Sequence, residues 1–172
     1  MTRQILVWLA MLAAAILVTV VAARIVRAAA GADALRAELQ GLQTQETARG
    51  LVIVLSADRL FPPGGADLKP TGAGDLARVA EALRGEPDRN VRVEGHADNT
   101  GSQSWNLELS KRRAEVVGTA LVRAGVEASR VTMQGFGDAV PVAGNDTSAG
   151  RQRNRRVEIV VQPPPPSLGG ER

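Results

Sequence analysis

The chain has 172 residues, no cysteine and one histidine, and 21 lysine plus arginine residues against 18 aspartate plus glutamate residues give it a net charge of +3. This length accommodates one ordinary domain with short extensions. The composition excludes disulfides, cysteine-ligated metal centres, a thiol nucleophile and a multi-histidine metal site within one chain. Two tryptophans and two phenylalanines are too few for a base-stacking platform or a sugar-stacking cleft. The small basic excess leaves an acidic partner open.

The longest apolar stretch is residues 5–23, which carry no charge and are flanked by Arg3 on one side and by Arg24 and Arg27 on the other. As a helix rising ~1.5 Å per residue this stretch would be about 28 Å long, close to the ~30 Å hydrocarbon core of a bilayer. We therefore expect residues 1–23 to form an N-terminal transmembrane anchor, with membrane lipid contacting residues 5–23.

The alternative for this segment is a cleaved signal peptide, because residues 21–23 and 28–30 end in the small residues that signal peptidases accept. The apolar core of a signal peptide has only about 7–15 residues, and arginines rarely follow it directly, so we favour the retained anchor. The basic flank after the segment favours a cytoplasmic C-terminal side, although long translocated domains often override that rule.

Residues 24–50 show the spacing of a helix, since Leu35, Leu39 and Leu42 recur at i, i+4 and i+7 among alanine, arginine, glutamate and glutamine. This apolar seam covers about one heptad, whereas a coiled coil needs three or four. We interpret the segment as a helical spacer between the membrane and a domain.

Residues 51–162 have the periodicity of one domain. A continuous apolar run, three alternating segments and two amphipathic stretches predict strands at 51–55, 91–94, 131–133 and 157–161 and helices at 76–83 and 104–124. The order β-α-β-α-β-β predicts an α/β fold of the α+β sandwich kind, with two main helices packed on a mixed four-stranded sheet. The proline run that begins at Pro163 predicts a disordered tail over residues 163–172.

One arginine of the long predicted helix lies on the apolar face, which should be buried, and not on the exposed face. Arg113 falls in the middle of the apolar arc, and Asn106 lies two turns earlier on the same line. A buried charge left without a partner costs ~3–5 kcal/mol, and the nearest acid in sequence is Asp98, in the loop of residues 96–101. One interpretation is a structural Arg113–Asp98 ion pair that fixes the helix to the sheet.

The other interpretation makes the same two side chains the poles of a binding site. A guanidinium grips a carboxylate through two parallel hydrogen bonds, and a carboxylate accepts from an ammonium. Together Arg113 and Asp98 would complement an amino-acid terminus, which carries both groups on one carbon. The loop of Asp98 lies between a strand and a helix, where open α/β sheets usually bind ligands.

Three separated motifs resemble one known family. Residues 93–126 (VEGHADNTGSQSWNLELSKRRAEVVGTALVRAGV), 135–146 (GFGDAVPVAGND) and 150–161 (GRQRNRRVEIVV) are similar, in this order, to the OmpA-like C-terminal domain family. Members of that family are non-catalytic modules of bacterial cell-envelope proteins that bind peptidoglycan non-covalently. The resemblance covers roughly residues 51–162 and implies the same fold and function here.

The resemblance also implies a set of ligand-binding residues. In the family, the aspartate of a Gly-His-Thr-Asp-like loop and the second arginine of a Ser-x-Arg-Arg-like stretch grip the diaminopimelate of the stem peptide. These positions match Asp98 and Arg113. By the same match Asn106 lines the pocket, and an arginine of the pair Arg155 and Arg156 closes it.

Two positions depart from the family pattern. Ala97 stands where the family usually has threonine, so a hydroxyl contact to the ligand is lost at that position of the site. Pro62 follows Phe61 where the family often has a polar residue, which removes a contact from the first loop. Neither change touches the ammonium–carboxylate clamp.

Other chemistries fit the residues less well. His96 and Asp98 form an H-x-D pair, but without a second histidine, a cysteine or a serine elbow we expect no catalysis, metal or cofactor, and we interpret His96 as a hydrogen-bonded loop anchor. Residues 151–156 (RQRNRR) resemble a nucleic-acid patch, yet the scarcity of aromatic residues argues against nucleic acid. A proton-driven stator subunit needs an acid within the membrane, and residues 5–23 contain none.

The sequence therefore predicts a membrane-tethered module of a Gram-negative-type envelope, with its domain in the periplasm, that binds the diaminopimelate-containing stem peptide of peptidoglycan. We favour an uncleaved inner-membrane anchor, and an exported outer-membrane form is the alternative. The alternative function is a scaffold that contacts other envelope proteins, with Asp98 and Arg113 as a purely structural ion pair.

Overall fold

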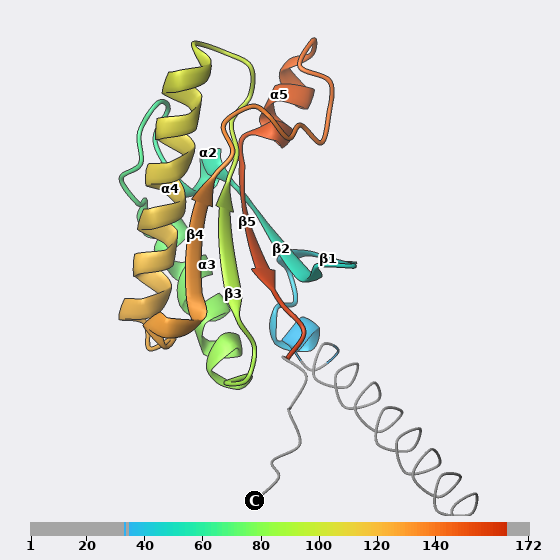
Figure 1. Ribbon diagram of the computed structural model, residues 1–172, viewed down its shortest axis with the longest axis vertical. Coiled ribbons are helices and arrows are strands. Elements are labelled where there is room, and N and C mark those ends of the chain that lie inside the picture. The colour runs from blue at the N-terminus through green and yellow to red at the C-terminus, as the bar shows by residue number, and fades with distance from the viewer. Residues whose placement is uncertain (1–32, 34, 165–172) are drawn as a thin grey trace, which may run out of the picture. The chain divides into compact units, whose positions relative to one another are not determined.

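A computed structural model describes residue 33 and residues 35–164 (Figure 1). Its elements follow in the order β1 (Gln43–Thr47), β2 (Gly50–Ser56), α2 (Ala57–Leu60), α3 (Pro70–Arg84), β3 (Val91–Gly95), α4 (Gln103–Arg123), the 3-10 helix η1 (Ala128–Arg130), β4 (Val131–Gly135), α5 (Ser148–Asn154) and β5 (Arg156–Val161).

The strands form one mixed sheet in the order β1-β2-β5-β3-β4. β5 is antiparallel to both of its neighbours, β2 and β3, while β3 and β4 are parallel. β2, β3 and β4 therefore all end at the same edge of the sheet, where β5 begins: Ser56 pairs with Arg156, and Gly95 pairs with Val157. The segments that follow β2, β3 and β4 and the segment that precedes β5 therefore meet at this edge.

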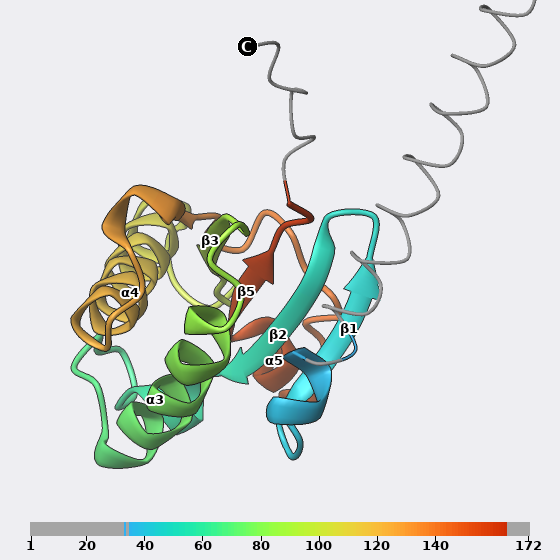
Figure 2. The same cartoon turned by 90° about the horizontal axis from the view of Figure 1, so that it is seen from below.

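The core lies between one face of the sheet and the helices α3 and α4 (Figures 1 and 2). Side chains alternate along each strand, so Ile53 of β2 and Ile159 of β5 point into this core together with Val117 and Leu121 of α4. α4 approaches β3 so closely that only glycine fits at position 95: a Cβ atom there would lie 2.0 Å from the carbonyl oxygen of Ser110. This contact fixes α4 against the sheet at the height of the loop that follows β3.

The predicted fold class is confirmed, since helices pack on a mixed α+β sheet, but the strand number is wrong: the sheet has five strands instead of four. The additional strand is β1, which pairs antiparallel with β2 and places Gln43 opposite Val54. β1 is the outermost strand of the sheet and consists of polar residues, so it lacks the apolar alternation that indicates a strand.

The helical spacer predicted for residues 24–50 is wrong over its second half. Residues 35–38 are helical, and Leu35 and Leu39 are buried in the domain core, but the chain then turns at Gly41, whose φ of 87° favours glycine, and continues as β1. The compact unit accordingly begins at Leu35 and not at residue 51. The leucine spacing reflects packing against the domain.

The predicted membrane anchor, residues 1–23, and the first part of the predicted spacer lie outside the described residues, as does most of the proline-rich tail. Among the residues that the structure describes, none of the helices combines the length and the apolar character needed to cross a bilayer.

Candidate ligand-binding site

Charged side chains from four segments gather at the edge where the strands end. Asp58 belongs to α2, directly after β2; Asp98 lies in the loop after β3; Arg113 belongs to α4; and Arg155 directly precedes β5. We call these four residues the clamp cluster. The sheet topology explains why Asp58, Asp98 and Arg155 meet, since they follow β2 and β3 and precede β5 at this edge. Packing of α4 on the sheet brings Arg113 close to them.

Asp98 is 6 % exposed and its carboxylate has two partners. Oδ1 accepts from the backbone N–H of Thr100 at 2.8 Å, and Oδ2 accepts from Nη1 of Arg155 at 2.7 Å. Burial alone would raise the pKa of Asp98, but the hydrogen bonds from Arg155 and Thr100 outweigh it and hold the pKa below its ordinary value of 3.8. Asp98 is therefore ionised at neutral pH.

The loop that carries Asp98 is fixed from behind. The side-chain Nδ2 of Asn106, which is buried, donates to the backbone carbonyl of Asp98 at 3.0 Å. The backbone N–H of Ala97 donates to the carbonyl of Gly137 at 2.8 Å, and the Ala97 side chain is buried. Asn106 thus holds the backbone of the loop, while its predicted contact with a ligand stays a prediction.

Arg113 is 4 % exposed, and its Nε donates to the carbonyl of Gly65 at 2.9 Å. The guanidinium carbon lies 5.2 Å from the centre of the Phe61 ring, a cation–π contact. Within the described residues the terminal nitrogens of Arg113 have no hydrogen-bond partner, and neither is sealed from solvent. Burial lowers the pKa of Arg113, and the nearby carboxylates of Asp58 and Asp98 oppose that shift.

The predicted structural ion pair between Arg113 and Asp98 does not form. No carboxylate of the described residues lies within 4.0 Å of the Arg113 guanidinium, and Asp98 is paired with Arg155 instead. The buried guanidinium of Arg113 is held by a backbone carbonyl and an aromatic ring. The N–H groups of its two terminal nitrogens are therefore available to another group.

Arg155 joins the two acids of the clamp cluster. Its Nε and Nη2 donate to the two carboxylate oxygens of Asp58 at 2.9 and 2.7 Å, and its Nη1 donates to Asp98. The hydrogen bonds that Arg155 donates to Asp58 and Asp98 raise the pKa of Arg155, and the bonds to Asp58 lower the pKa of that carboxyl. The two acids share one guanidinium, and Arg113 supplies the second cation.

Arg156, the other predicted candidate, is not part of this cluster. It is buried, its Nε donates to Oε1 of Glu158 at 2.7 Å, and its Nη2 donates to the carbonyl of Val140. Asp58, by contrast, was not predicted from the sequence. The feature of the sequence that could have indicated Asp58 is its position: it is an acid that comes just after a buried strand, at the edge where the loop of Asp98 also begins.

A family model described as the OmpA family matches residues 60–155. This chain belongs to the OmpA family. Two curated proteins are similar to it in sequence. The "Probable lipoprotein YiaD" of Escherichia coli (strain K12) is 41 % identical over 131 residues, which are 75 % of this chain and 60 % of that protein. The "Peptidoglycan-binding protein ArfA" of Mycobacterium tuberculosis (strain ATCC 25618 / H37Rv) is 45 % identical over 101 residues, 59 % of this chain and 31 % of its own.

A solved structure gives the same fold. The cell wall anchor of the T6SS from Pseudomonas aeruginosa is 34 % identical, with a TM-score of 0.65, and the match covers 77 % of this chain and 93 % of that one. The chain thus spans 60 % or less of the two sequence relatives but nearly all of this solved structure.

A second charged cluster of this OmpA-family domain lies within the sheet. Glu94, His96 and Glu158 are buried, and one donor atom from each lies within 4.8 Å of the others, as metal ligands would. Both carboxylates are already bound by guanidinium groups, however, since Arg49 donates to Glu94 and to Glu158 at 2.7 Å each. The three side chains therefore form the centre of an ion-pair network, which we call the sheet cluster.

His96 does not act as the predicted hydrogen-bonded anchor. Within the described residues its two ring nitrogens have no hydrogen-bond partner, and the ring stacks on Phe136 with 5.3 Å between the ring centres and an angle of 8°. Burial and the nearby Arg156 lower the pKa of His96 to about 4, so the imidazole is neutral. The backbone N–H of His96 donates to the carbonyl of Arg156 at 2.9 Å.

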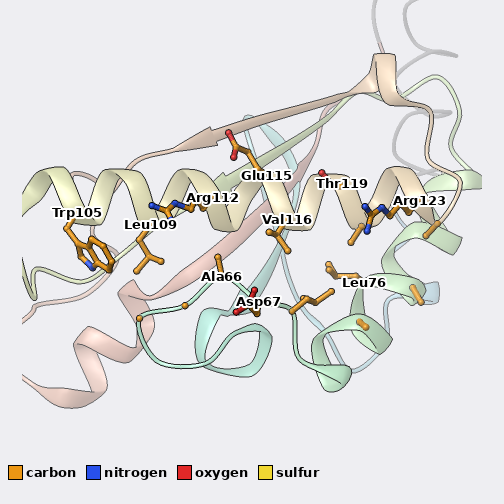
Figure 3. Close-up of a pocket in the computed structure, with 17 residues that line it drawn as sticks. Ala66, Asp67, Leu76, Trp105, Leu109, Arg112, Glu115, Val116, Thr119 and Arg123 are labelled. Carbon is orange, nitrogen blue, oxygen red and sulfur yellow. The ribbon is translucent and has the colours of Figure 1, made fainter.

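Beside the clamp cluster the OmpA-family domain has a groove of about 880 Å³ between α3, α4 and the loop of residues 64–68 (Figure 3). Trp105, which is 52 % exposed, stands at one end of the groove, and Leu109 and Val116 of α4 face Ala66 across it. The groove reaches the clamp cluster at Gly65, the residue whose carbonyl holds Arg113.

Proposed function

We propose that this chain binds peptidoglycan non-covalently and has no chemistry of its own. Membership of the OmpA family supports the proposal, as do relatives whose names describe a peptidoglycan-binding protein and a cell wall anchor. The proposed ligand is the diaminopimelate of the stem peptide. Its free amino-acid terminus carries an ammonium and a carboxylate on one carbon, which the clamp cluster complements.

The observation that carries this proposal is Arg113. A buried guanidinium normally has an acidic partner, and here its two terminal nitrogens have none among the described residues although they reach solvent. Arg113 would clamp the ligand carboxylate through both nitrogens, and the ionised Asp98 would accept from the ammonium. Asn106 and Ala97 would hold the loop, and Arg155, tied to Asp58, would close the pocket.

A single site of this kind should bind weakly. Each charge-assisted hydrogen bond contributes ~1.5–3 kcal/mol, while association costs several kcal/mol in lost translational and rotational freedom. Tethering to a membrane and a polymeric ligand that is always nearby would raise the effective strength by avidity.

The tether would be residues 5–23, acting as an uncleaved inner-membrane anchor that places the domain in the periplasm of a Gram-negative-type envelope. The exported outer-membrane form is the alternative. Two reporters fused after Gln162, one active only in the periplasm and one active only in the cytoplasm, test this topology: activity of the cytoplasmic reporter alone would rule out wall binding by the chain.

Sedimentation with insoluble peptidoglycan tests the site. A fragment that begins at residue 33, so that Leu35, Leu39 and β1 are retained, should pellet with the polymer. Asp98→Ala and Arg113→Ala should stay in the supernatant. Lys111→Ala is the matched control, because Lys111 is an exposed cation of the same helix whose contact with Glu115 is 4.0 Å long. If the two clamp variants pellet like the parent, the proposed site is wrong; if the parent itself does not pellet, the scaffold alternative is favoured.

A further inference from the structure

A hollow of about 550 Å³ is lined in part by Arg155, a member of the clamp cluster. Its floor is the sheet face opposite α3 and α4, since Val54 of β2 and Glu158 of β5 alternate with the core residues of those strands. Gln152 and Arg153 of α5 form one wall, at the end of the sheet where α5 is seen in Figure 1. Hollow and clamp share one side chain, that of Arg155.

The charge of this hollow is unbalanced. Three arginines line it against one acid, Glu158. Arg155 is bound by the acids of the clamp cluster, and Arg156 is bound by Glu158. Arg153 is exposed and, within the described residues, has no ion-pair partner. One uncompensated cation therefore faces the hollow at its α5 wall.

The uncharged polar lining of the hollow consists mainly of amides. Gln43, Gln45 and Gln152 line it, and none of the three uses its side-chain amide in a hydrogen bond to another described residue. Each amide offers two donors and an acceptor, which suits a peptide backbone. No aromatic ring lines the hollow, so it lacks the flat surface on which a sugar ring would stack.

We propose that this hollow binds the segment of the stem peptide next to the residue held by the clamp cluster, and that Arg153 takes a free carboxylate on that segment. This inference rests on the proposed function. A ligand whose ammonium lies on Asp98 is already next to Arg155, and Arg155 lines the hollow. The neighbouring amino acid would then enter the hollow, whose lining includes the glutamine amides and Arg153.

The groove in Figure 3 is the competing place for this segment, and its charge argues against it. Arg112 and Arg123 line that groove together with Asp67 and Glu115, so its formal charges cancel. A carboxylate gains more beside the unbalanced arginine of the hollow than in a groove without net charge.

The test uses the full chain in detergent and two synthetic stem tripeptides that end in diaminopimelate. The peptides are identical except that the acidic residue before the diaminopimelate has its α-carboxyl either free or amidated. We expect the parent to bind the free acid about two- to fivefold more tightly than the amide by titration calorimetry. Arg153→Gln should lower the affinity for the free acid to that for the amide and leave the amide affinity unchanged.

Arg123→Gln is the matched control, since Arg123 is an exposed arginine of the groove in Figure 3. It should leave both affinities unchanged. The inference is overturned if the parent does not distinguish the peptides, if Arg153→Gln weakens both equally, or if Arg123→Gln alone removes the preference. In each of those results the parent still binds a diaminopimelate peptide, whereas a parent that binds neither peptide contradicts the proposed function itself.

Discussion

The clamp cluster and the sheet cluster both pair acidic side chains with arginines, but the two clusters differ in how many of their charged groups have partners. In the sheet cluster each carboxylate contacts two guanidinium groups: Glu94 contacts Arg49 and Arg92, and Glu158 contacts Arg49 and Arg156. In the clamp cluster both acids share one guanidinium, and the buried Arg113 has no carboxylate within 4.0 Å among the described residues.

This difference separates a cluster that holds the fold together from one that can hold a ligand. A buried ion-pair network with all of its partners in place offers nothing to a ligand, and removing one member leaves a charge stranded. A buried cation supported only by a carbonyl and a ring keeps its strongest donors available. Variants of the sheet cluster should therefore lower stability, and variants of the clamp cluster should lower ligand affinity.

The largest effect is expected for Glu158→Gln. This change leaves the buried Arg156 without its carboxylate, and the free energy of unfolding should fall by about 3–5 kcal/mol in urea denaturation. Glu115→Gln is the control, because Glu115 is exposed and its contact with Lys111 is 4.0 Å long; its effect should stay within about 0.5 kcal/mol. Equal effects of both changes would contradict a structural role for the sheet cluster.

The next effect is a pH dependence from His96. Its pKa is about 4 in the folded domain and near 6.5 in the unfolded chain, so between these values only the unfolded state takes up the proton. Its contribution to stability is complete above pH 6.5 and is lost as the pH falls toward 4, by about 3 kcal/mol over the window. His96→Phe should lack this loss when the two proteins are unfolded in urea from pH 8 to pH 4. Parallel curves would show that burial does not hold the imidazole neutral.

Arg113→Ala should reverse the pattern of Glu158→Gln. Affinity for a diaminopimelate-containing peptide should fall about tenfold to a hundredfold, because a two-point contact with the ligand carboxylate is lost. The free energy of unfolding should fall by only about 1–2 kcal/mol, since no ion pair breaks. Arg113→Lys retains the charge without the planar fork and should lie between the parent and Arg113→Ala in affinity. A stability loss as large as that of Glu158→Gln would mean that Arg113 has a structural role.

The sequence predicted the parts of the site that depend on local periodicity. The inward position of Arg113 follows from the 100° turn per residue of a helix, and Asn106 follows from the same helix. Asp58 could not be found in this way, because it joins the cluster only when β2 and β3 end at one edge. Arg155 and Arg156 could not be told apart either, since the side chains of neighbouring residues diverge where a strand begins and only the register of β5 decides between them.

The same limit applies to β1. Its residues show no apolar alternation, and pairing with β2 is what makes them a strand. The leucines before it were read as a spacer because periodicity reveals an apolar face without revealing what covers that face. Leu35 and Leu39 in fact pack in the domain core.

The smallest effect is expected from Ala97, the position where the family resemblance implies a threonine. Ala97 is buried next to Asp98, so a hydroxyl introduced there would add a polar group beside the clamp cluster. Ala97→Thr should raise affinity for the diaminopimelate peptide about two- to tenfold, the contribution of one neutral hydrogen bond. Ala97→Val is the matched control, because it adds nearly the same volume without the hydroxyl. A gain shared by both variants would be an effect of packing on the loop; a gain confined to threonine would show that the clamp cluster lacks one donor that other family members have.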